Sequence, residues 1–240
     1  MTKSTLRITL LTLFACFSAA VSKAQIGYDY SQYDFGASIA FNSYFGDTQT
    51  SVGTKSVNFN FDFNQTAFVN YILEVQTGTL KGGDATLDQL GRQFSANYTY
   101  YAFRLQVQAG ELIDYSRSPV FNALKNLYAG VGIGMVYSNI TSINRYSTQL
   151  AGYYTPGNNS ASQLFLPARI GYELKIFNKN QRPDYKIDVG YQYNIVFGDQ
   201  LDGFKAGTHN DAFGQFTIGV KISVGGVTSY RKEIRQPGFY

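Results

Sequence analysis

The chain has 240 residues, enough for one large domain or two small ones. Charged residues make up only 15% of it, against about 25% in an average soluble domain, whereas aromatic residues reach 16%, with 20 Tyr, 19 Phe and no Trp. The formal charge of +4 falls to +1 without the first 24 residues (20 − 3 = 17 basic against 16 acidic), so composition excludes a nucleic-acid partner.

The first 24 residues have the parts of a secretory signal peptide. Two basic residues precede an apolar run at 8–21, and Ser22 and Ala24 supply small side chains just before Gln25. We therefore expect a signal peptide at 1–24 that is removed on export. Cys16, the single cysteine, stands in a stretch similar to a lipobox, but we interpret it as part of the discarded signal. The mature chain then has no disulfide and no cysteine metal site.

Eight stretches of the mature chain alternate between apolar and polar residues with a period of two, the pattern of strands with two unlike faces. In the clearest stretch, Tyr185 to Phe197, every odd-numbered residue is apolar or aromatic. The eight runs lie at residues 35–42, 57–64, 69–76, 100–108, 130–138, 164–175, 185–197 and 215–224. No segment of the mature chain approaches the roughly 20 apolar residues of a transmembrane helix.

Short and long connections alternate between these runs, as they do in outer-membrane barrels. Short turns are expected near 64–66 and 178–184, and long polar loops at 46–54, 79–92, 140–162 and 198–211. Residues 110–126 should lie on the short-turn side despite their length. Ser118 followed by Pro119 predicts a helix of one or two turns there.

Two further boundaries follow from the pattern. We expect the barrel to occupy residues 25–225 and a periplasmic C-terminal tail to occupy 226–240.

The stretch Lys81-Gly82-Gly83-Asp84 is too short for a phosphate-cradling loop and lacks the Lys-Ser/Thr that follows such loops. We interpret it as a loop tip.

Alternation alone does not say whether the apolar faces contact lipid or a dry interior, as in a secreted lipocalin-like barrel. The polar faces carry Gly, Ser, Asn and Gln more than charges, and Gly130, Gly132 and Gly134 cluster there. Small side chains relieve crowding inside a narrow barrel but gain nothing on an open surface. The sequence therefore predicts an all-β fold, an eight-stranded antiparallel up-and-down transmembrane β-barrel. Aromatic girdles are expected from Phe177 and Tyr185 at the turn end and from Phe45, Tyr137 and Phe197 at the loop end.

Several short motifs resemble those of Bacteroidetes outer-membrane β-barrel proteins. They are Ser43-Tyr44-Phe45-Gly46-Asp47, the long run from Gly91-Arg92-Gln93-Phe94 to Phe103-Arg104, Lys125-Asn126-Leu127-Tyr128-Ala129-Gly130, and the signal ending Ala24-Gln25. The resemblance covers essentially the whole mature chain and is similar in architecture to OmpA- and OmpX-like barrels; PorT-like proteins belong to the same broad group. It implies an outer-membrane location and an eight-stranded barrel, but no single activity.

Nine charged residues fall on the inward faces of the expected strands. They are Asp62, Glu74, Arg104, Arg169, Glu173, Lys175, Lys186, Asp188 and Lys221. Charges in a narrow interior must be paired, because an isolated buried ion costs several kcal/mol. We expect a salt-bridge network that plugs the barrel; the alternative is a narrow pore for small solutes.

These charges also bear on the register of the hairpin that joins the sixth and seventh runs. Pairing residue 173 with 188 would place Glu173 opposite Asp188 and Lys175 opposite Lys186. Opposite charges are preferred across strands. We therefore predict a register shifted by two residues, with Glu173 opposite Lys186 or Lys175 opposite Asp188.

Other chemistry has little support. His209, the single histidine, is followed by Asp211 on a long loop without a serine, although Ser51 or Ser147 could approach it. A lipid-modifying enzyme is therefore a distant third hypothesis, and Asp199, Asp202 and Asp211 with His209 form at best a weak metal site. We expect no catalytic, cofactor or metal site.

The expected partners are the lipid of the outer membrane and a periplasmic or surface protein. The basic tail, with Arg231, Lys232, Glu233 and Arg235, could dock a protein in the periplasm, and Tyr153-Tyr154 with Asn158-Asn159 could contact carbohydrate or protein outside. Ordinary solvated loops and a disordered terminus explain both segments as well. The sequence thus predicts a non-enzymatic structural or interaction role in the cell envelope.

Overall fold

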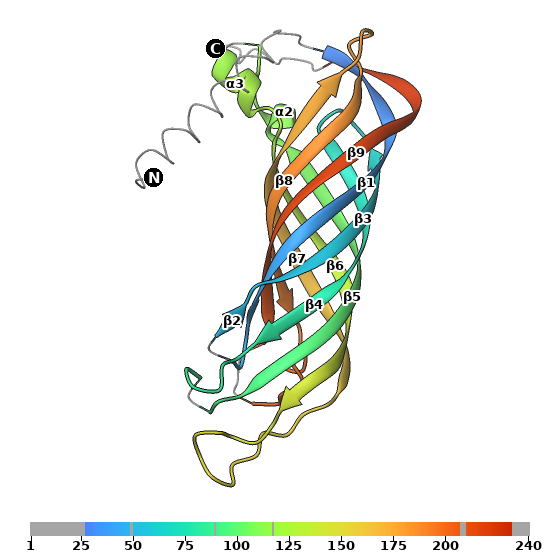
Figure 1. Ribbon diagram of the computed structural model, residues 1–240. Coiled ribbons are helices and arrows are strands. Elements are labelled where there is room, and N and C mark those ends of the chain that lie inside the picture. The colour runs from blue at the N-terminus through green and yellow to red at the C-terminus, as the bar shows by residue number, and fades with distance from the viewer. Residues whose placement is uncertain (1–26, 49, 89, 117, 207–209, 232–240) are drawn as a thin grey trace, which may run out of the picture.

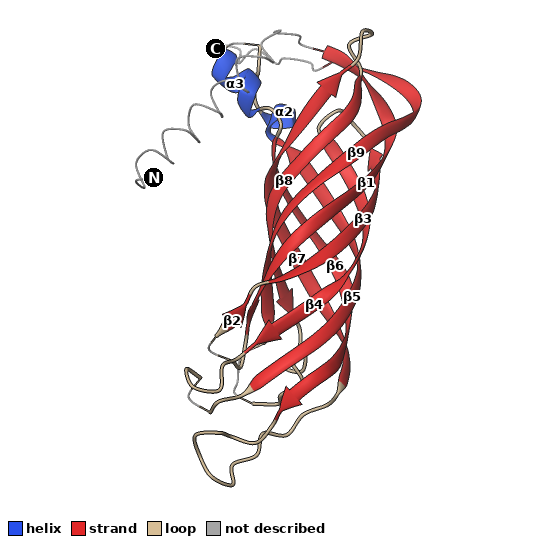
Figure 2. Cartoon of the chain, in the orientation of Figure 1, coloured by secondary structure: helices blue, strands red, loops and turns tan. Residues whose placement is uncertain are grey.

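The computed structural model describes residues 27–48, 50–88, 90–116, 118–206 and 210–231. Eight long strands form a closed barrel in this part of the chain, and a ninth, two-residue strand lies at its rim (Figures 1 and 2). The strands are β1 (Gly27–Phe45), β2 (Ser51–Val52), β3 (Thr54–Asn64), β4 (Val69–Gly82), β5 (Gln93–Gln108), β6 (Leu127–Asn144), β7 (Ser160–Phe177), β8 (Pro183–Val196) and β9 (Ala212–Arg231).

Each long strand pairs antiparallel with the strands before and after it in the chain. β9 pairs with β1 along almost its whole length and closes the sheet. The predicted all-β, eight-stranded up-and-down barrel is therefore confirmed. None of the helices in the described residues has the length and apolar character to cross a membrane.

The short-turn end carries the one connection that is not short. Residues 109–126 contain α2 (Ala109–Leu112) and α3 (Pro119–Leu124), which lie together at the top of the barrel in Figure 1. Ser118 caps α3 by accepting a hydrogen bond from the amide of Phe121, 3.2 Å away, as the Ser118-Pro119 pair predicted. Gly110 packs against the ring of Phe68, because a Cβ there would lie 2.4 Å from that ring. The segment thus covers the turn end of the lumen.

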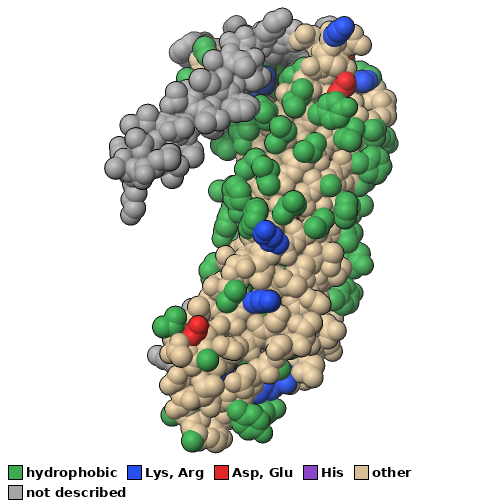
Figure 3. Space-filling model, viewed as in Figure 1, with side chains coloured by type: hydrophobic (Ala, Val, Ile, Leu, Met, Phe, Trp, Pro, Cys, Tyr) green, Lys and Arg blue, Asp and Glu red, His purple; other side chains and the backbone are tan. Residues whose placement is uncertain are grey.

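The apolar faces of the strands point outward, as predicted. Phe35, Phe59 and Leu73 are each more than half exposed, whereas Asp62 and Gln106 on the alternate positions are buried. Figure 3 shows hydrophobic side chains over the wall on the turn side, while the wall toward the loop end has few of them. Water would not favour so much exposed apolar surface, but a lipid bilayer would cover it.

Toward the loop end the two faces exchange their character. On β5 the outward residues are apolar from Tyr101 to Val107, but they are polar from Gln93 to Thr99. The inward residues change the opposite way, from Arg104 near the turns to Phe94 near the loops. The alternation continues unbroken, so the strand remains regular while its surroundings change.

The other strands of this wall show the same reversal. On β4, Leu80 is buried while Thr79 and Lys81 face outward, and on β6 Val136 is buried while Asn139 is exposed. The sixteen residues of β5 span about 53 Å at roughly 3.3 Å per residue, whereas the apolar band of a membrane barrel is only about 25 Å tall. Even with the usual tilt, the loop half of the barrel therefore extends beyond the band.

The observed strands extend past several expected boundaries. Residues 79–82, 140–144 and 160–162 were expected in loops but belong to β4, β6 and β7. The reversal explains these three segments, because polar residues face outward there. At the turn end, β9 continues past 225 to Arg231 and pairs with the start of β1, so the barrel does not end at 225 and only 232–240 lie beyond it, outside the described residues.

One expected member of the aromatic girdles is wrongly placed. Tyr185, Tyr137, Phe45 and Phe197 are all exposed on the wall, but Phe177 packs against the small core of Phe68, Tyr115, Tyr30 and Ala67 at the turn end. The pairing of β7 with β8 shifts between Ile176 and Phe177, which turns Phe177 off the lipid face. Stacked rings on neighbouring strands occupy the outer wall near the turns instead; they are Phe63, Tyr71 and Phe103.

Candidate functional site

The nine predicted inward charges are all buried inside the turn half of the barrel. A tenth, Asp34 on β1, joins them. We call these ten the ion network; they are Asp34, Asp62, Glu74, Arg104, Arg169, Glu173, Lys175, Lys186, Asp188 and Lys221. Five are carboxylates and five are cations, so the formal charge of the network is zero.

The register predicted for the β7–β8 hairpin is wrong. Glu173 lies opposite Asp188, and Lys175 lies opposite Lys186. Lys186 also lies opposite Lys221 on β9, so three lysines stand abreast on neighbouring strands. With Asp34 opposite Asp62, the backbone pairing brings like charges of the network together four times, and other members of the network compensate them.

For Lys186 and Lys221, the compensating partners come from strands further along the sheet. Lys186 lies 2.6 Å from Asp34 of β1, and Lys221 lies 2.6 Å from Asp62 of β3. Asp34 and Asp62 themselves stand opposite each other on β1 and β3. Each of these carboxylates therefore bonds a lysine two strands away.

Glu173 is the centre of the network. Its carboxylate lies 3.1 Å from Lys221, 3.7 Å from Lys186 and 3.9 Å from Lys175. It also accepts a hydrogen bond from the amide of Gln108, at 2.9 Å. One carboxylate thus contacts all three lysines.

Two arginine pairs complete the network toward the middle of the barrel. Arg104 lies 3.3 Å from Glu74. Arg169 bonds Asp188 directly and donates to the hydroxyl of Tyr128, at 2.8 Å. Gly171 leaves room for that ring, because a Cβ there would lie 2.4 Å from the Tyr128 hydroxyl. The glycines of the polar faces are where large inward side chains need space.

A void inside the network is very small. It has about 10 Å³ and lies among the two arginines, Asp188, Glu74 and Lys221, and a single water molecule needs roughly 10–15 Å³. A hydrated ion does not fit in it. The charged side chains therefore fill the lumen around this void.

An aromatic core closes the loop half, which the sequence did not predict. Tyr98, Tyr100, Phe165 and Phe213 come from β5, β7 and β9 and contact one another with ring centroids 5.0–6.4 Å apart. The hydroxyls of Tyr98 and Tyr100 bond the amide of Gln76, at 2.5 and 3.0 Å. The loop half of the interior thus combines an aromatic core with hydrogen-bonded polar side chains, and its only buried charges among the described residues lie in the loops.

Above this core, the loops meet at a second set of buried charges. We call Tyr44, Asp47, Arg92, Asp202 and Asp211 the loop-end cluster. The Tyr44 hydroxyl donates to Asp211, whose other oxygen accepts from the amide of Leu201 at 2.8 Å. Arg92 donates to the carbonyl of Asp47 and lies over the ring of Phe204, 5.4 Å from its centroid. The cluster joins the β1–β3, β4–β5 and β8–β9 loops over the mouth of the barrel.

The cluster gives a physical role to the Tyr-x-Gly-Asp motif at the end of β1. Tyr44 supplies the hydroxyl, and Asp47 supplies the contacts to Arg92. Gly46 is required between them, because a Cβ at that position would lie 1.9 Å from the Tyr44 hydroxyl and 2.4 Å from Asp211. The motif is therefore a loop-anchoring device in this chain.

Burial raises the pKa of each carboxyl in the cluster. The pKa of Asp211 is raised to about 7, mainly by burial and also by the charges of Asp199 and Asp47. Hydrogen bonds from Tyr44 and from the amide of Leu201 act in the opposite direction. Burial and the neighbouring Asp211 raise the pKa of Asp202 well above its usual range. Burial and the charge of Asp199 raise the pKa of Asp47 to about 6, although the positive charge of Arg92 lowers it. Asp47 and Asp211 therefore change charge near neutral pH.

The other residues considered for chemistry do not form a site. His209 lies outside the described residues. Ser51 and Ser147 use their hydroxyls to accept backbone amides, from Tyr44 and from residues of the β6–β7 loop. Within the described part of the chain, no three His, Cys, Asp or Glu side chains are arranged to hold a metal ion. Lys232, Glu233 and Arg235 of the tail, the signal peptide and Cys16 also lie outside the described residues.

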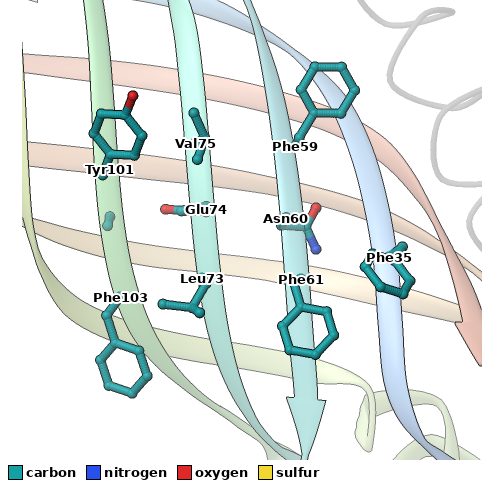
Figure 4. A pocket seen from close by; sticks show the side chains of 10 residues that line it. Phe35, Phe59, Asn60, Phe61, Leu73, Glu74, Val75, Tyr101 and Phe103 are labelled. Atoms are coloured by element: carbon teal, nitrogen blue, oxygen red, sulfur yellow. The ribbon is translucent and has the colours of Figure 1, made fainter. Parts of the chain in front are cut away.

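The outer wall has a hollow of about 620 Å³ on β1, β3, β4 and β5. Figure 4 shows the rings of Phe59, Phe61 and Phe103 with Leu73 and Val75 around it. Asn60 of β3 and Glu74 of β4, which lie on the inward positions of their strands, form part of its floor. The hollow has the shape and apolar character to take a lipid acyl chain and belongs to the lipid-facing wall.

Neither a family model nor a curated protein matches the sequence, so the resemblance to Bacteroidetes outer-membrane barrels stays a prediction. Among solved structures, the chain is similar to Neisserial surface protein A, with 14% identity, a TM-score of 0.44, and coverage of 81% of this chain and 98% of that one. It is also similar to the attachment invasion locus protein of Yersinia pestis, with 13% identity, a TM-score of 0.43, and coverage of 82% of this chain and 97% of that one. A third similar structure is OprG from Pseudomonas aeruginosa, with 11% identity, a TM-score of 0.36, and coverage of 83% of this chain and 99% of that one. Likenesses this loose say nothing about function.

Replacing Glu173 with Gln should destabilise the barrel strongly. The change leaves three buried lysines without their shared counter-charge, and breaking a buried ion pair costs roughly 3–5 kcal/mol. Urea unfolding of the protein in liposomes measures the loss. Asp184→Asn is the matched control, because Asp184 pairs with Arg182 at the surface, where a pair is worth about 0–1 kcal/mol. Equal losses in the two variants would contradict the role given to Glu173.

The loop-end cluster should hold the β8–β9 loop more firmly in acid than in alkali. The folded-state pKa of Asp211, about 7, lies above the ordinary carboxyl value near 4. Its stabilisation is therefore complete below about pH 4 and is lost as the pH rises through 7. Hydrogen exchange in residues 199–206, corrected for intrinsic rates, should be slower at pH 5 than at pH 8. Asp202→Asn removes one charge of the pair and should flatten this dependence; an unchanged profile would disprove the coupling.

Proposed function

We propose that this protein is an outer-membrane β-barrel with a structural or interaction role in the cell envelope, and that it works without enzymatic chemistry. The observation that carries the proposal is the combination of an apolar outer wall with a filled interior. The ion network and the aromatic core occupy the lumen in successive layers. What remains for contact with other molecules is the outer wall, the loops and the turn end.

The membrane location rests on the physics of the closed sheet. Every long strand pairs with a neighbour on both sides, so no row of backbone N–H and C=O groups would face lipid without a hydrogen-bond partner. The exposed apolar residues lie on strands whose buried faces are charged, the arrangement that hydrocarbon favours and water does not. Export by the signal peptide at 1–24 fits this location and remains a prediction.

The orientation follows from the connections. Outer-membrane barrels have short turns in the periplasm and long loops outside. The turns after β3 and β7 are short, while the loops after β6 and β8 are long and form ordered contacts over the barrel mouth. We therefore place α2, α3 and the ends of β1 and β9 in the periplasm. The polar half of the wall and the loop-end cluster then lie outside.

A bromolipid quenching experiment tests the membrane location. The chain has no Trp, so single Trp variants report only on their own positions. Leu73→Trp, on the apolar wall, should be quenched by phospholipids brominated on their acyl chains, whereas Asn97→Trp, on the polar wall, should not. Equal quenching of the two variants, or none in either, would rule out the proposed position of the membrane boundary.

Conductance separates the closed barrel from the narrow pore. The wild-type protein in a planar bilayer should give no steady open-channel current. An Arg104→Ala/Arg169→Ala variant should also stay closed, because the contacts of Tyr100 with Phe165 and of Phe165 with Phe213 persist above the network. Steady single-channel steps from the wild type would overturn the closed interior and favour the pore.

A further inference from the structure

A polar trough crosses the outside of the barrel wall near the loop end. Val52, Lys81, Ser95 and Ser142 are paired in one row across β2, β4, β5 and β6. The row is roughly 14 Å long, at about 4.8 Å between strands. Gln93 and Asn144 form the next row, beside Gly82 and Gly83, and the hollow over these residues is about 430 Å³. The space is in the range of small-molecule sites, about 300–1,000 Å³.

A β-bulge shapes one side of the trough. The pairing of β5 with β6 skips Thr141 between Ser95 and Ala96, and the Thr141 hydroxyl donates to the carbonyl of Ser95 at 2.9 Å. Bulges re-aim side chains next to binding sites. Gly83, whose φ of +88° favours glycine, lies with no side chain against the backbone of Arg92 and Gln93 at the edge of the trough. The trough is thus built by strand pairing, one bulge and one missing side chain.

The lining has the chemistry of a phosphorylated sugar site. Lys81 is exposed, and no carboxylate of the described residues lies within ion-pair distance of it. The nearest acid in sequence, Asp84, is engaged by the amides of Thr86 and Leu87 at 2.8 and 3.0 Å. The amides of Gln93 and Asn144 and the hydroxyls of Ser95 and Ser142 offer both donors and acceptors. A cation beside such groups suits a phosphate attached to a polyhydroxylated ring.

The distance of the trough from the apolar wall indicates which kind of lipid could supply that ligand. Val75 is the last apolar outward residue of β4, and Lys81 follows it by about six residues. This separation is roughly 20 Å along the strand, which corresponds to about 15 Å along the barrel axis at the usual strand tilt. The headgroup layer on each side of a bilayer is only about 5–8 Å thick. The phosphate of an ordinary phospholipid does not reach the trough. A headgroup of several sugars does.

We propose that this trough binds the phosphorylated oligosaccharide headgroup of a glycolipid in the outer leaflet, with Lys81 on the phosphate and Gln93, Ser95, Ser142 and Asn144 on the sugar hydroxyls. The proposal rests on the outer-membrane placement proposed above, and it assigns the exposed polar wall a lipid ligand. The bromolipid measurement on Leu73→Trp decides the placement separately. A protein inserted in the membrane with an empty trough would refute this proposal alone.

The test uses hydrogen exchange of the full chain in nanodiscs. Three samples are compared: phosphatidylcholine with phosphatidylglycerol, phosphatidylcholine with a phosphorylated lipooligosaccharide, and plain phosphatidylcholine with soluble glucose 6-phosphate. Residues 81–83, 93–95 and 141–144 should gain protection only with the lipooligosaccharide. Lys81→Gln should raise the half-saturating fraction of the glycolipid about tenfold, the effect of losing one charge-assisted hydrogen bond.

The matched control is Lys205→Gln, which removes an exposed cation from the β8–β9 loop and should leave the half-saturating fraction unchanged. Equal protection by phosphatidylglycerol would overturn the requirement for sugar. Equal protection by soluble glucose 6-phosphate would overturn the lipid source. A Lys81→Gln variant that binds like the wild type would overturn the site itself.

Discussion

Ten charged side chains inside a narrow barrel must cancel, because we propose that lipid surrounds that part of the wall, and because the void among them is about the size of one water molecule. Five carboxylates and five cations do so, with Glu173 joined to three lysines. This requirement explains why like charges tolerate each other on neighbouring strands. The lumen is so narrow that Lys186 and Lys221 reach carboxylates on other strands, whereas Lys175 pairs with Glu173 of its own strand. The charges therefore balance over the network as a whole.

A second constraint, the change of surroundings along the barrel axis, explains the loop half. Inside the membrane, the outer face must be apolar and the backbone must be paired; beyond it, water favours a polar outer face and an apolar core. β5 meets both conditions on one regular strand, with Tyr101 facing lipid and its neighbour Tyr100 facing the core. The position where the faces exchange therefore marks the proposed membrane boundary from the residues themselves.

The period-two alternation predicted the eight strands, the small and uncharged residues of the polar faces predicted which face is outward, and the Ser118-Pro119 pair predicted the helix. Asp34 was missed because the first run was begun at Phe35, although it shares its face with Gly36 and Ser38. The hairpin register was wrong because its partners come from other strands: Asp34, which pairs with Lys186, is 152 residues away in sequence. Phe94, Tyr98 and Leu80 carried the signal for the loop-half core, hidden because the opposite face is polar there. Nothing local to Asp202 or Asp211 predicts the loop-end cluster, since its members meet only after the loops fold over the mouth.

The two sets of buried charges differ in a way that matters for the exterior. The ion network has five carboxylates and five cations, paired with one another inside the turn half of the barrel. The loop-end cluster has three carboxyls and one arginine. Burial raises the pKa of Asp47 to about 6, that of Asp211 to about 7 and that of Asp202 well above its usual range. The cluster is therefore the part of the molecule whose order depends on the medium. The trough lies on regular strands of the wall and not on these loops, so a ligand there would meet the same surface whether the loops over the mouth are held or released.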